Sequence, residues 1–311
     1  MSGAGAPFTT RFAPSPTGPL HLGHAYSAML AHDMARAAGG RFLLRIEDID
    51  RARARPQWEA QIFDDLAWLG LDWPRPVMRQ SARLPAHAAA LARLEAMGLT
   101  YPCRCRRADI EAAAGAPQEG VPQFGPDGRI YPGTCRGRVM AERGGDDVIR
   151  LDMARAVRAL PADAAFTETG PAHAGTHRLD PERLIREVGD IVLVRRGMGS
   201  SYHLAVVVDD AEQGVTHVIR GEDLFAATQI HVLLQRLLGL PVPLYHHHRL
   251  IRDEKGRRLA KRDDARAIAR YRAEGASPAD IRALVGLERS GPQRIGINPR
   301  AASIPPRNHP G

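Results

Sequence analysis

The amino-acid sequence predicts an α/β protein with a doubly wound, Rossmann-type parallel sheet, and three observations support this. Short apolar runs at residues 8–13 and 41–46 are predicted to be strands. The segment 20–38 between them has helical apolar spacing and ends at Gly39-Gly40. A further helix is expected to begin at Pro56, so that strand and helix alternate. That order favours parallel strands joined by crossover helices, with ligands bound at the carboxyl ends of the strands.

The remaining elements are predicted from apolar spacing and from the residues at their ends. Helices are expected over residues 56–70, 84–97, 225–238, 264–274 and 278–287, and strands over residues 190–195, 204–208 and 216–220. Four consecutive apolar residues from Ala205 suit a central parallel strand that is buried on both faces. Ser277 before Pro278, with Asp280 in the first turn, is typical of a helix start.

These elements divide the chain into five segments. Residues 1–100 and 188–248 are expected to form the two halves of the sheet domain, separated by an insertion over residues 101–187 in which the alternation breaks down. Residues 249–290 hold a basic loop and short helices. Residues 291–311 are rich in Pro, Arg and Gly, have little to bury, and are predicted to be a disordered tail.

The composition is that of an ordinary globular chain with an excess of positive charge. The 311 residues carry a formal net charge of +8, mostly from arginine, with lysine only at Lys255 and Lys261. Arginine makes bidentate contacts with phosphate, so this balance favours a polyanionic partner such as nucleic acid; an arginine-rich coding bias is the alternative. No run of ~18 apolar residues predicts a membrane span, and residues 1–7 lack the pattern of a secretory leader. A cytoplasmic protein is therefore expected.

The most informative stretch is residues 11–24, Arg-Phe-Ala-Pro-Ser-Pro-Thr-Gly-Pro-Leu-His-Leu-Gly-His. A predicted strand ends here, a Pro/Gly turn follows, and a helix opens with His21 and His24 about one turn apart. The N–H groups and positive dipole end of a helix N-terminus suit phosphate, and Gly23 lets the backbone approach a ligand closely. The pattern predicts a site for a nucleotide triphosphate.

This stretch resembles the HIGH signature of class I aminoacyl-tRNA synthetases, and its beginning resembles the glutamyl and glutaminyl branch of that family. The resemblance implies a catalytic domain that forms an adenylate from ATP and an amino acid. It implies that His21, Gly23 and His24 contact ATP and that both histidines are catalytic. It also implies that glutamate is held by the start of the motif, which comprises Arg11, Phe12, Ala13, Pro14 and Ser15.

Two further segments carry the same resemblance. Residues 45–50, Arg-Ile-Glu-Asp-Ile-Asp, place a carboxylate at the end of a predicted strand, where it can bind an ammonium group. They are similar to the family's RIEDTD segment, with Ile49 in place of its threonine, which implies that Glu47 contacts the α-amino group of glutamate. Tyr202 precedes the predicted strand 204–208, and Arg220 ends the strand 216–220. Both correspond to glutamate-binding positions, and a guanidinium is a natural partner of a carboxylate.

The basic run at residues 257–262 resembles the KMSKS loop of these enzymes. Lys261 takes the position of its second lysine, whereas Arg258 replaces the first lysine and Ala260 removes a hydroxyl. The resemblance implies that Lys261 is catalytic and binds the phosphates of ATP, which Mg²⁺ accompanies. Catalysis would consist mostly of positioning and of stabilising the α-phosphate as a carboxylate attacks it. A solvated basic loop is the alternative interpretation.

Three cysteines lie within residues 103–135, an odd number that argues against a disulfide scaffold. Cys103 and Cys105, with Cys135 roughly 30 residues later, can converge on one tetrahedral metal, and Tyr131 can supply a phenolate as a fourth ligand. The pattern resembles the structural zinc site of short paralogues in this family, while three free thiols are the alternative. The histidines at 246–248 lack spaced partners and are not expected to bind metal.

The resemblance covers about residues 8–290 and leaves only short helices after the basic loop. It is therefore strongest to the short paralogues that form the glutamyl-Q tRNA(Asp) synthetase family. Those enzymes activate glutamate without tRNA and transfer it to queuosine in the anticodon of tRNA(Asp). The implied partners are queuosine-bearing tRNA(Asp), L-glutamate and ATP, with the insertion against an RNA stem recognised by shape and phosphates, and the chain acting as a monomer. Two alternatives stay open: a minimal glutamyl-tRNA synthetase that charges the tRNA 3′ end, and a non-catalytic binding paralogue.

Overall fold

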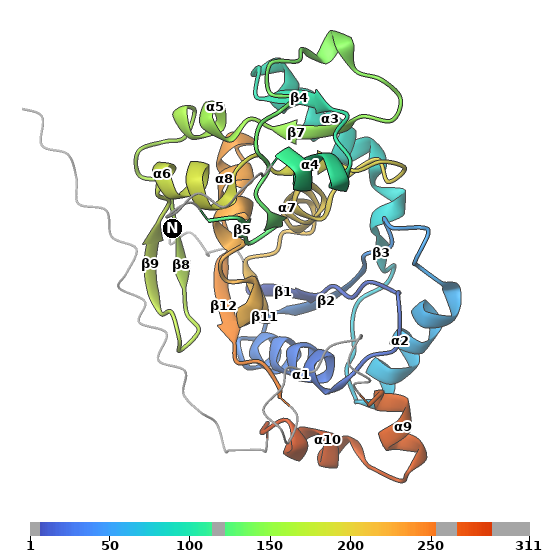
Figure 1. Cartoon of the computed structure of the whole chain (residues 1–311). Coiled ribbons are helices and arrows are strands. Elements are labelled where there is room, and N and C mark those ends of the chain that lie inside the picture. Colours follow the sequence, from blue (N-terminus) through green and yellow to red (C-terminus); the bar gives the residue numbers. More distant parts are fainter. Residues whose placement is uncertain (1–6, 114–121, 253–265, 288–311) are drawn as a thin grey trace, which may run out of the picture.

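The structure is a computed structural model that describes residues 7–113, 122–252 and 266–287. It confirms a mixed α/β fold (Figure 1). Within these residues no helix combines the length and the apolar character needed to cross a membrane. The basic run with Lys261 and the predicted tail at 291–311 lie outside the described residues.

The first half of the chain forms the predicted strand–helix alternation. Strand β1 (Thr9–Phe12), helix α1 (Leu22–Ala37), strand β2 (Arg41–Ile46), helix α2 (Pro56–Trp68) and strand β3 (Met78–Arg79) follow one another. The three strands pair in parallel in the order β1-β2-β3. Pro56 occupies the first turn of α2, where its missing N–H breaks no helical hydrogen bond.

The second half supplies a four-stranded sheet that lies against the first. Its order is β11 (His217–Gly221), β12 (Leu244–His248), β8 (Ala165–Glu168) and β9 (Gly175–Arg178). The pairs β11–β12 and β12–β8 are parallel, while β8–β9 is antiparallel. The N–H of Thr216 donates to the carbonyl of Thr9 at 2.9 Å, which places the start of β11 beside β1. The carboxyl ends of β1, β2 and β11 therefore meet at one edge.

A separate antiparallel sheet forms from strands β4 (Thr100–Cys103), β7 (Val148–Leu151) and β10 (Val192–Val194), in the order β10-β7-β4. A small hairpin of β5 (Phe124–Gly125) and β6 (Gly128–Arg129) accompanies it. The surrounding helices are α3 (Leu84–Ala96), α4 (Arg107–Ala113), α5 (Met153–Arg158) and α6 (Pro181–Arg183), followed by a π-helical turn over Leu184–Val188. Short 3₁₀ turns cover Gln80–Ala82, Met140–Glu142 and Glu222–Leu224. Strands β8 and β12, which the sequence analysis did not predict, form the middle of the four-stranded sheet between β11 and β9.

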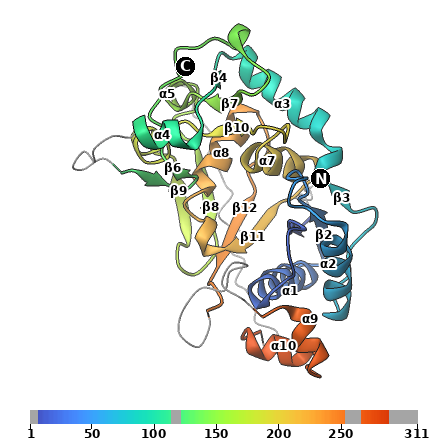
Figure 2. The ribbon, with the colours of Figure 1, turned by 45° about the vertical axis from the view of Figure 1, so that its right-hand side comes forward.

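The predicted strand at 204–208 is wrong, because these residues belong to helix α7 (Tyr202–Glu212). The hydroxyl of Ser201 accepts from the N–H of Leu204 and caps the helix, and Tyr202 is its first residue. Residues 204–207 are all buried, and Leu204, Val206 and Val207 share one apolar cluster with residues of α3, β10 and α8 (Thr228–Leu237). Figure 2 shows α7 among these three elements. A short, uniformly apolar run does not distinguish a buried helix from a central strand, and here the capping serine was the better signal.

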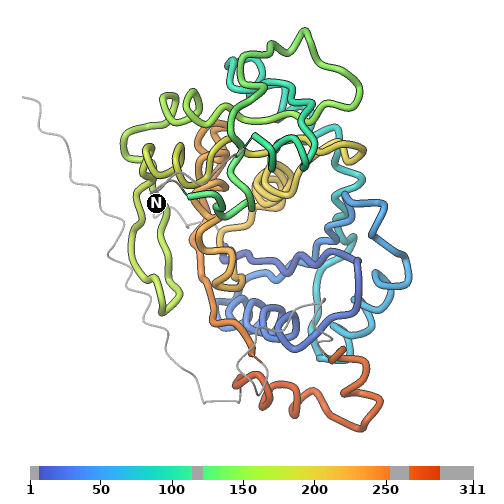
Figure 3. The backbone as a smooth tube through the Cα atoms, in the orientation of Figure 1, coloured from blue at the N-terminus to red at the C-terminus, as the bar shows by residue number. Residues whose placement is uncertain are grey.

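The C-terminal helices α9 (Ile268–Ala273) and α10 (Pro278–Leu284) pack beside α1, as the tube in Figure 3 shows. Ile268 and Ile281 are buried in the same apolar cluster as the inner face of α1. Arg282 donates two hydrogen bonds to the carboxylate of Asp33, at 2.6 and 3.0 Å. The predicted start of α10 is confirmed, because Ser277 and Asp280 form a reciprocal capping box.

Candidate functional site

A pocket of about 350 Å³ lies at the carboxyl ends of β1, β2 and β11, beside the N-terminus of α1. This volume is large enough for a small-molecule ligand. Ser27 and His248 also line it, although the sequence assigned them no role. The pocket brings together most of the residues predicted from separate motifs, namely Arg11, Phe12, Ala13, His21, Gly23, His24, Glu47, Tyr202 and Arg220.

Two residues of the first motif do not line the pocket. Pro14 is buried, and its carbonyl accepts from the N–H of Glu47 at 3.0 Å. The carbonyl of Ser15 accepts from the N–H of Thr17 at 2.8 Å, within the turn that leads to α1. The carbonyl of Pro14 therefore helps to fix the backbone position of Glu47 at the end of β2.

Lys261 lies outside the described residues, but both flanks of its segment end at the pocket. Ile251 lines the pocket. On the other flank, Ala267 forms a β-bridge with His21, and the N–H of Ile268 donates to the carbonyl of Leu20 at 2.9 Å. The described chain thus stops and resumes beside the N-terminus of α1.

The two histidines of the first motif cap α1 reciprocally. His21 is the N-cap residue, and its Nδ1 accepts from the N–H of Gly23 at 3.1 Å. Nδ1 of His24 accepts from the N–H of His21 at 3.2 Å, and the two rings lie 3.8 Å apart between centroids. In a neutral imidazole this arrangement places the ring proton on Nε2. A Cβ at Gly23 would come within 3.0 Å of the His21 ring, so glycine preserves this cap.

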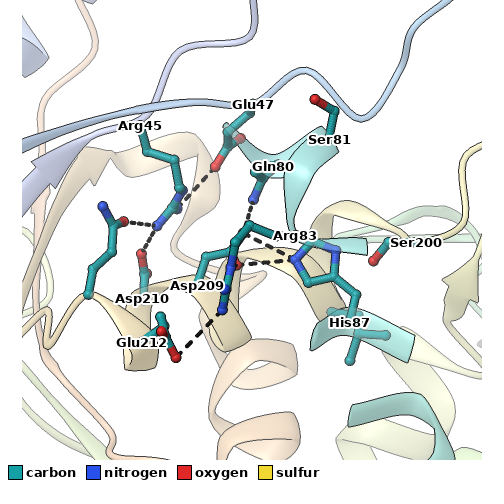
Figure 4. Close-up of polar contacts among 12 residues, drawn as sticks. Arg45, Glu47, Gln80, Ser81, Arg83, His87, Ser200, Asp209, Asp210 and Glu212 are labelled. Carbon is teal, nitrogen blue, oxygen red and sulfur yellow. Dashed lines mark hydrogen bonds and ion pairs between the residues drawn. The ribbon is translucent and has the colours of Figure 1, made fainter. Parts of the chain in front are cut away.

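Two residues that line the pocket, Arg11 and Glu47, belong to a buried network of charges that the sequence analysis missed. Asp210 on α7 accepts from Nε of Arg11 at 2.9 Å and from Nη1 of Arg45 at 2.6 Å. Arg45 also donates to Oε1 of Glu47 at 3.1 Å and to Gln213 at 3.0 Å (Figure 4). One carboxylate from the second half of the chain thus orients two predicted glutamate-binding side chains, Arg11 directly and Glu47 through Arg45.

The pKa shifts in this network reflect a balance between burial and charged partners. Burial raises the pKa of Asp210, but the charges and hydrogen bonds of Arg11 and Arg45 outweigh it, so the pKa lies below its usual value. At Glu47 burial outweighs the opposing charges of Arg45 and Arg11, so its pKa lies above the usual value. Burial also raises the pKa of Tyr202, which therefore keeps its phenolic proton and can donate a hydrogen bond.

Asp209, the neighbour of Asp210 on α7, contacts a different part of the chain. It accepts from Gln80 at 3.0 Å and contacts Nε2 of His87 at 3.2 Å, and Arg83 lies 3.4 Å away (Figure 4). The two aspartates therefore connect α7 both to β1 and β2 and to α3. The sequence signal for these contacts was the pair of adjacent aspartates at the end of an apolar run, because carboxylates next to buried residues need buried partners.

Asp48, which had no predicted role, accepts from the N–H and hydroxyl of Ser81.

The three cysteines converge away from the pocket. Their sulfur atoms all lie within 4.8 Å of one another, and Cys105 and Cys135 are 3.5 Å apart, too far for a disulfide. The hydroxyl of Tyr131 lies 3.3 Å from Sγ of Cys103 and 3.4 Å from Sγ of Cys105. Zinc–sulfur bonds of about 2.3 Å in a tetrahedron place sulfur atoms about 3.8 Å apart, so these side chains could hold a metal.

The protonation of this cluster also suits a metal. Burial raises the pKa of Cys135, yet hydrogen bonds from Tyr131 and the backbone lower it to about 7, which favours a thiolate near neutral pH. Burial raises the pKa of Cys105 and of Tyr131. Those two groups therefore need the charge of a cation before they ionise.

Histidines around the sheet make the stability of the fold depend on pH. Burial is the largest cause that lowers the pKa of His217, to about 4, and of His231, His246, His247 and His248. The unfolded chain binds these protons at about pH 6.5, so the stabilisation is present above that pH and is lost as the pH falls towards 4. His32, whose pKa is raised, opposes this trend.

We therefore expect the melting temperature to fall by at least about 2 °C between pH 7.5 and pH 5. Differential scanning fluorimetry across this range measures it. A His217→Asn variant is expected to show a shallower fall, and a melting temperature that stays constant from pH 7.5 to 5 would contradict the assignment.

Comparison with known proteins places this site in context. The family model for the catalytic domain of class I tRNA synthetases of the E and Q type matches residues 7–297. A protein named glutamyl-Q tRNA(Asp) synthetase from Rhodobacter capsulatus is 67% identical over 281 residues, 89% of this chain and 99% of that protein. One of the same name from Symbiobacterium thermophilum is 46% identical, covering 87% of this chain and 83% of that protein.

Solved structures share the architecture. A glutamate-tRNA synthetase from Elizabethkingia anophelis superposes with a TM-score of 0.67 at 27% identity, covering 90% of this chain. A glutamate tRNA ligase from Elizabethkingia meningosepticum, in complex with its amino acid, gives a TM-score of 0.65 at 28% identity over 89% of this chain. The chain spans only about three fifths of each of these two proteins, 61% and 60%.

Proposed function

The chain belongs to the glutamyl-Q tRNA(Asp) synthetase family of class I synthetases, which makes it a ligase, and we propose that it attaches glutamate to queuosine of tRNA(Asp) at the expense of ATP. One observation carries the proposal. A single pocket gathers groups suited to an acidic amino acid, Glu47 and Arg220, beside a helix N-terminus that bears His21 and His24. An amino acid and a triphosphate could therefore lie next to each other, as adenylate formation requires.

Each side chain in the pocket has a proposed role. Glu47 binds the α-ammonium group of glutamate, and Arg220 with the hydroxyl of Tyr202 binds its side-chain carboxylate. Arg11, fixed by Asp210, adds positive charge next to the α-carboxylate. Together with the backbone at Phe12 and Ala13, these groups complement an amino acid with one positive and two negative charges.

ATP would bind at the N-terminus of α1, where the N–H groups of the first turn and the positive dipole end favour phosphate. The proton on Nε2 of His21 and of His24 gives each ring a donor for a phosphate oxygen. Class I synthetases use ATP with Mg²⁺, and we assign Lys261 to the same phosphates because both flanks of its segment end here.

The chemistry consists of two transfers. An oxygen of the glutamate α-carboxylate attacks the α-phosphorus of ATP, and pyrophosphate leaves with the electron pair of the broken bond. A nucleophilic group of queuosine then attacks the mixed-anhydride carbonyl and releases AMP. The protein supplies alignment and positive charge rather than a covalent nucleophile.

Two assays test this function. Glutamate-dependent ATP–pyrophosphate exchange is expected without any tRNA, followed by transfer of labelled glutamate to tRNA(Asp) that carries queuosine. Matched tRNA(Asp) without queuosine is the control and should stay unlabelled. Equal labelling of both tRNAs would reject the acceptor, label at the 3′ end of tRNA(Glu) would indicate a minimal glutamyl-tRNA synthetase, and the absence of exchange would indicate a non-catalytic paralogue.

The cysteine cluster is the proposed site of one structural Zn²⁺ per chain. Cys103, Cys105 and Cys135 would bind it as thiolates, and Tyr131 as a phenolate. Because β4 carries Cys103 and the other ligands lie in the loops that follow, the ion would fix the segment that faces an RNA stem.

Elemental analysis of purified protein is expected to find about one zinc per chain. A Cys105→Ser variant should lose the metal and melt at a lower temperature, since zinc binds the folded form more tightly than the unfolded chain. A Tyr131→Phe variant keeps the three thiolates and should release zinc to a chelator more readily than the wild type. Metal-free protein that melts at the temperature of zinc-loaded protein would reject this site.

A further inference from the structure

The guanidinium of Arg220 is held by an unusual set of partners. Its Nε donates to Nε2 of His247 and its Nη1 to Nδ1 of His231, both at 3.0 Å. Its Nη2 donates to Oγ1 of Thr228 at 2.8 Å and to the carbonyl of Leu224 at 3.3 Å. None of these four partners, all within the described part of the chain, is a carboxylate.

These contacts determine the protonation of the rings, because a guanidinium can only donate hydrogen bonds. His231 accepts at Nδ1 and must carry its proton on Nε2, which lies 3.0 Å from Nδ1 of His203. His203 then carries its proton on Nε2 and donates to Asp127 at 3.0 Å. On the other side, His247 accepts at Nε2 and donates from Nδ1 to Glu168.

Two relays therefore run from Arg220, each through neutral imidazole to a carboxylate. Burial, and then the charge of Arg220, hold the pKa of His231 well below its usual value. Burial likewise lowers the pKa of His247, against the effect of Glu168. Hydrogen bonds from the rings lower the pKa of Asp127 and of Glu168 although burial opposes them, so both relays end on a negative charge.

The partners of Arg220 differ from those of the other two buried arginines near the pocket, Arg11 and Arg45. Arg11 and Arg45 both contact the carboxylate of Asp210 directly, which compensates part of their charge. The carboxylates that support Arg220 are one imidazole away at Glu168 and two at Asp127. The hydrogen bonds thus fix the direction of the Arg220 guanidinium. Among the described residues, however, no anion contacts it directly. This uncompensated charge favours an anionic ligand group in the pocket.

We propose that His231 and His247 are positioning residues, which aim the guanidinium of Arg220 at a substrate carboxylate without neutralising it. This inference rests on the proposed role of Arg220 in glutamate binding. Asp127 lies in the β5–β6 hairpin of the inserted segment and does not line the pocket. Through His203 and His231, glutamate binding would therefore depend on a residue outside the pocket.

The test compares two substitutions of one residue. His231→Leu removes the acceptor, whereas the side-chain oxygen of His231→Asn takes the place of Nδ1. In ATP–pyrophosphate exchange, His231→Leu is expected to raise the KM for glutamate about tenfold, because a hydrogen bond to a charged group is lost. The KM for ATP should change less than about twofold, and His231→Asn should lie within about threefold of wild type. Asp127→Asn is expected to raise the glutamate KM by about threefold.

His32→Asn is the matched control, since His32 is also buried but pairs with Asp72 away from the pocket. Melting curves verify folding, and if His231→Leu does not fold, the Asp127→Asn variant provides the decisive comparison. The inference is overturned if the Leu and Asn variants behave alike, if the KM values for ATP and glutamate rise together, or if Asp127→Asn leaves the glutamate KM unchanged. A wild type without glutamate-dependent exchange would instead reject the proposed function itself.

Discussion

Replacing Arg220 by alanine is expected to lower kcat/KM for glutamate by at least about 30-fold in ATP–pyrophosphate exchange, because truncating one partner of a buried charge pair costs about 2 kcal/mol or more. Arg220 is 5% exposed, so the substrate carboxylate would lose its partner in a site that offers little water in exchange. The KM for ATP should change far less, because the proposed phosphate site lies at the N-terminus of α1 and not at β11.

Two companion variants sharpen this result. Arg220→Lys keeps the charge but loses the fork of hydrogen bonds to His231, His247 and Thr228, so an intermediate loss is expected. Arg107→Ala removes an arginine that is 93% exposed on α4 and should leave exchange unchanged. Unaltered glutamate use by Arg220→Ala would remove this residue from the site.

Replacing Asp210 by asparagine is expected to destabilise the fold by about 3 kcal/mol or more, because it leaves two buried guanidinium groups without their shared anion. Arg45 is fully buried and Arg11 nearly so, and neither can reach water without disrupting β1 or β2. Urea denaturation measures the free energy of unfolding. Because Arg11 and Glu47 lose their fixed orientation, the KM for glutamate should also rise in whatever fraction stays folded.

The matched control removes a carboxylate from an exposed ion pair. Glu111→Gln breaks its contact with Arg107 on the surface of α4 and should change the free energy of unfolding by less than about 1 kcal/mol. Equal stability of Asp210→Asn and Glu111→Gln would show that the buried network contributes nothing beyond an ordinary surface pair. A stable Asp210→Asn variant with normal glutamate binding would also reject its orienting role.

Much of the site could be predicted because its signals are local in sequence. The turn before α1, the two histidines that cap it and the carboxylate after β2 all lie within short segments whose backbone conformation follows from a few residues. The cysteines were predictable from their residue type, because thiolates separated along the chain can converge on one metal. Helix starts with a proline in the first turn, as at Pro56 and Pro278, were predictable for the same reason.

The error at residues 204–208 had a different origin. An apolar run with buried residues on every side is compatible with both a central strand and a central helix, and only the neighbours decide between them. Here α3, α8 and β10 surround the segment, and Ser201 caps it, so a helix forms.

By itself the sequence determined the strand–turn–helix that can receive phosphate and the residue types that suit an acidic amino acid. Only the tertiary structure decided which charges lie together: Asp210 is 199 residues from Arg11 and 165 from Arg45, and Glu168 is 79 residues from His247. The physical reason is that a charge buried by folding must find its partner in space, and no local propensity or spacing encodes a partner so distant along the chain.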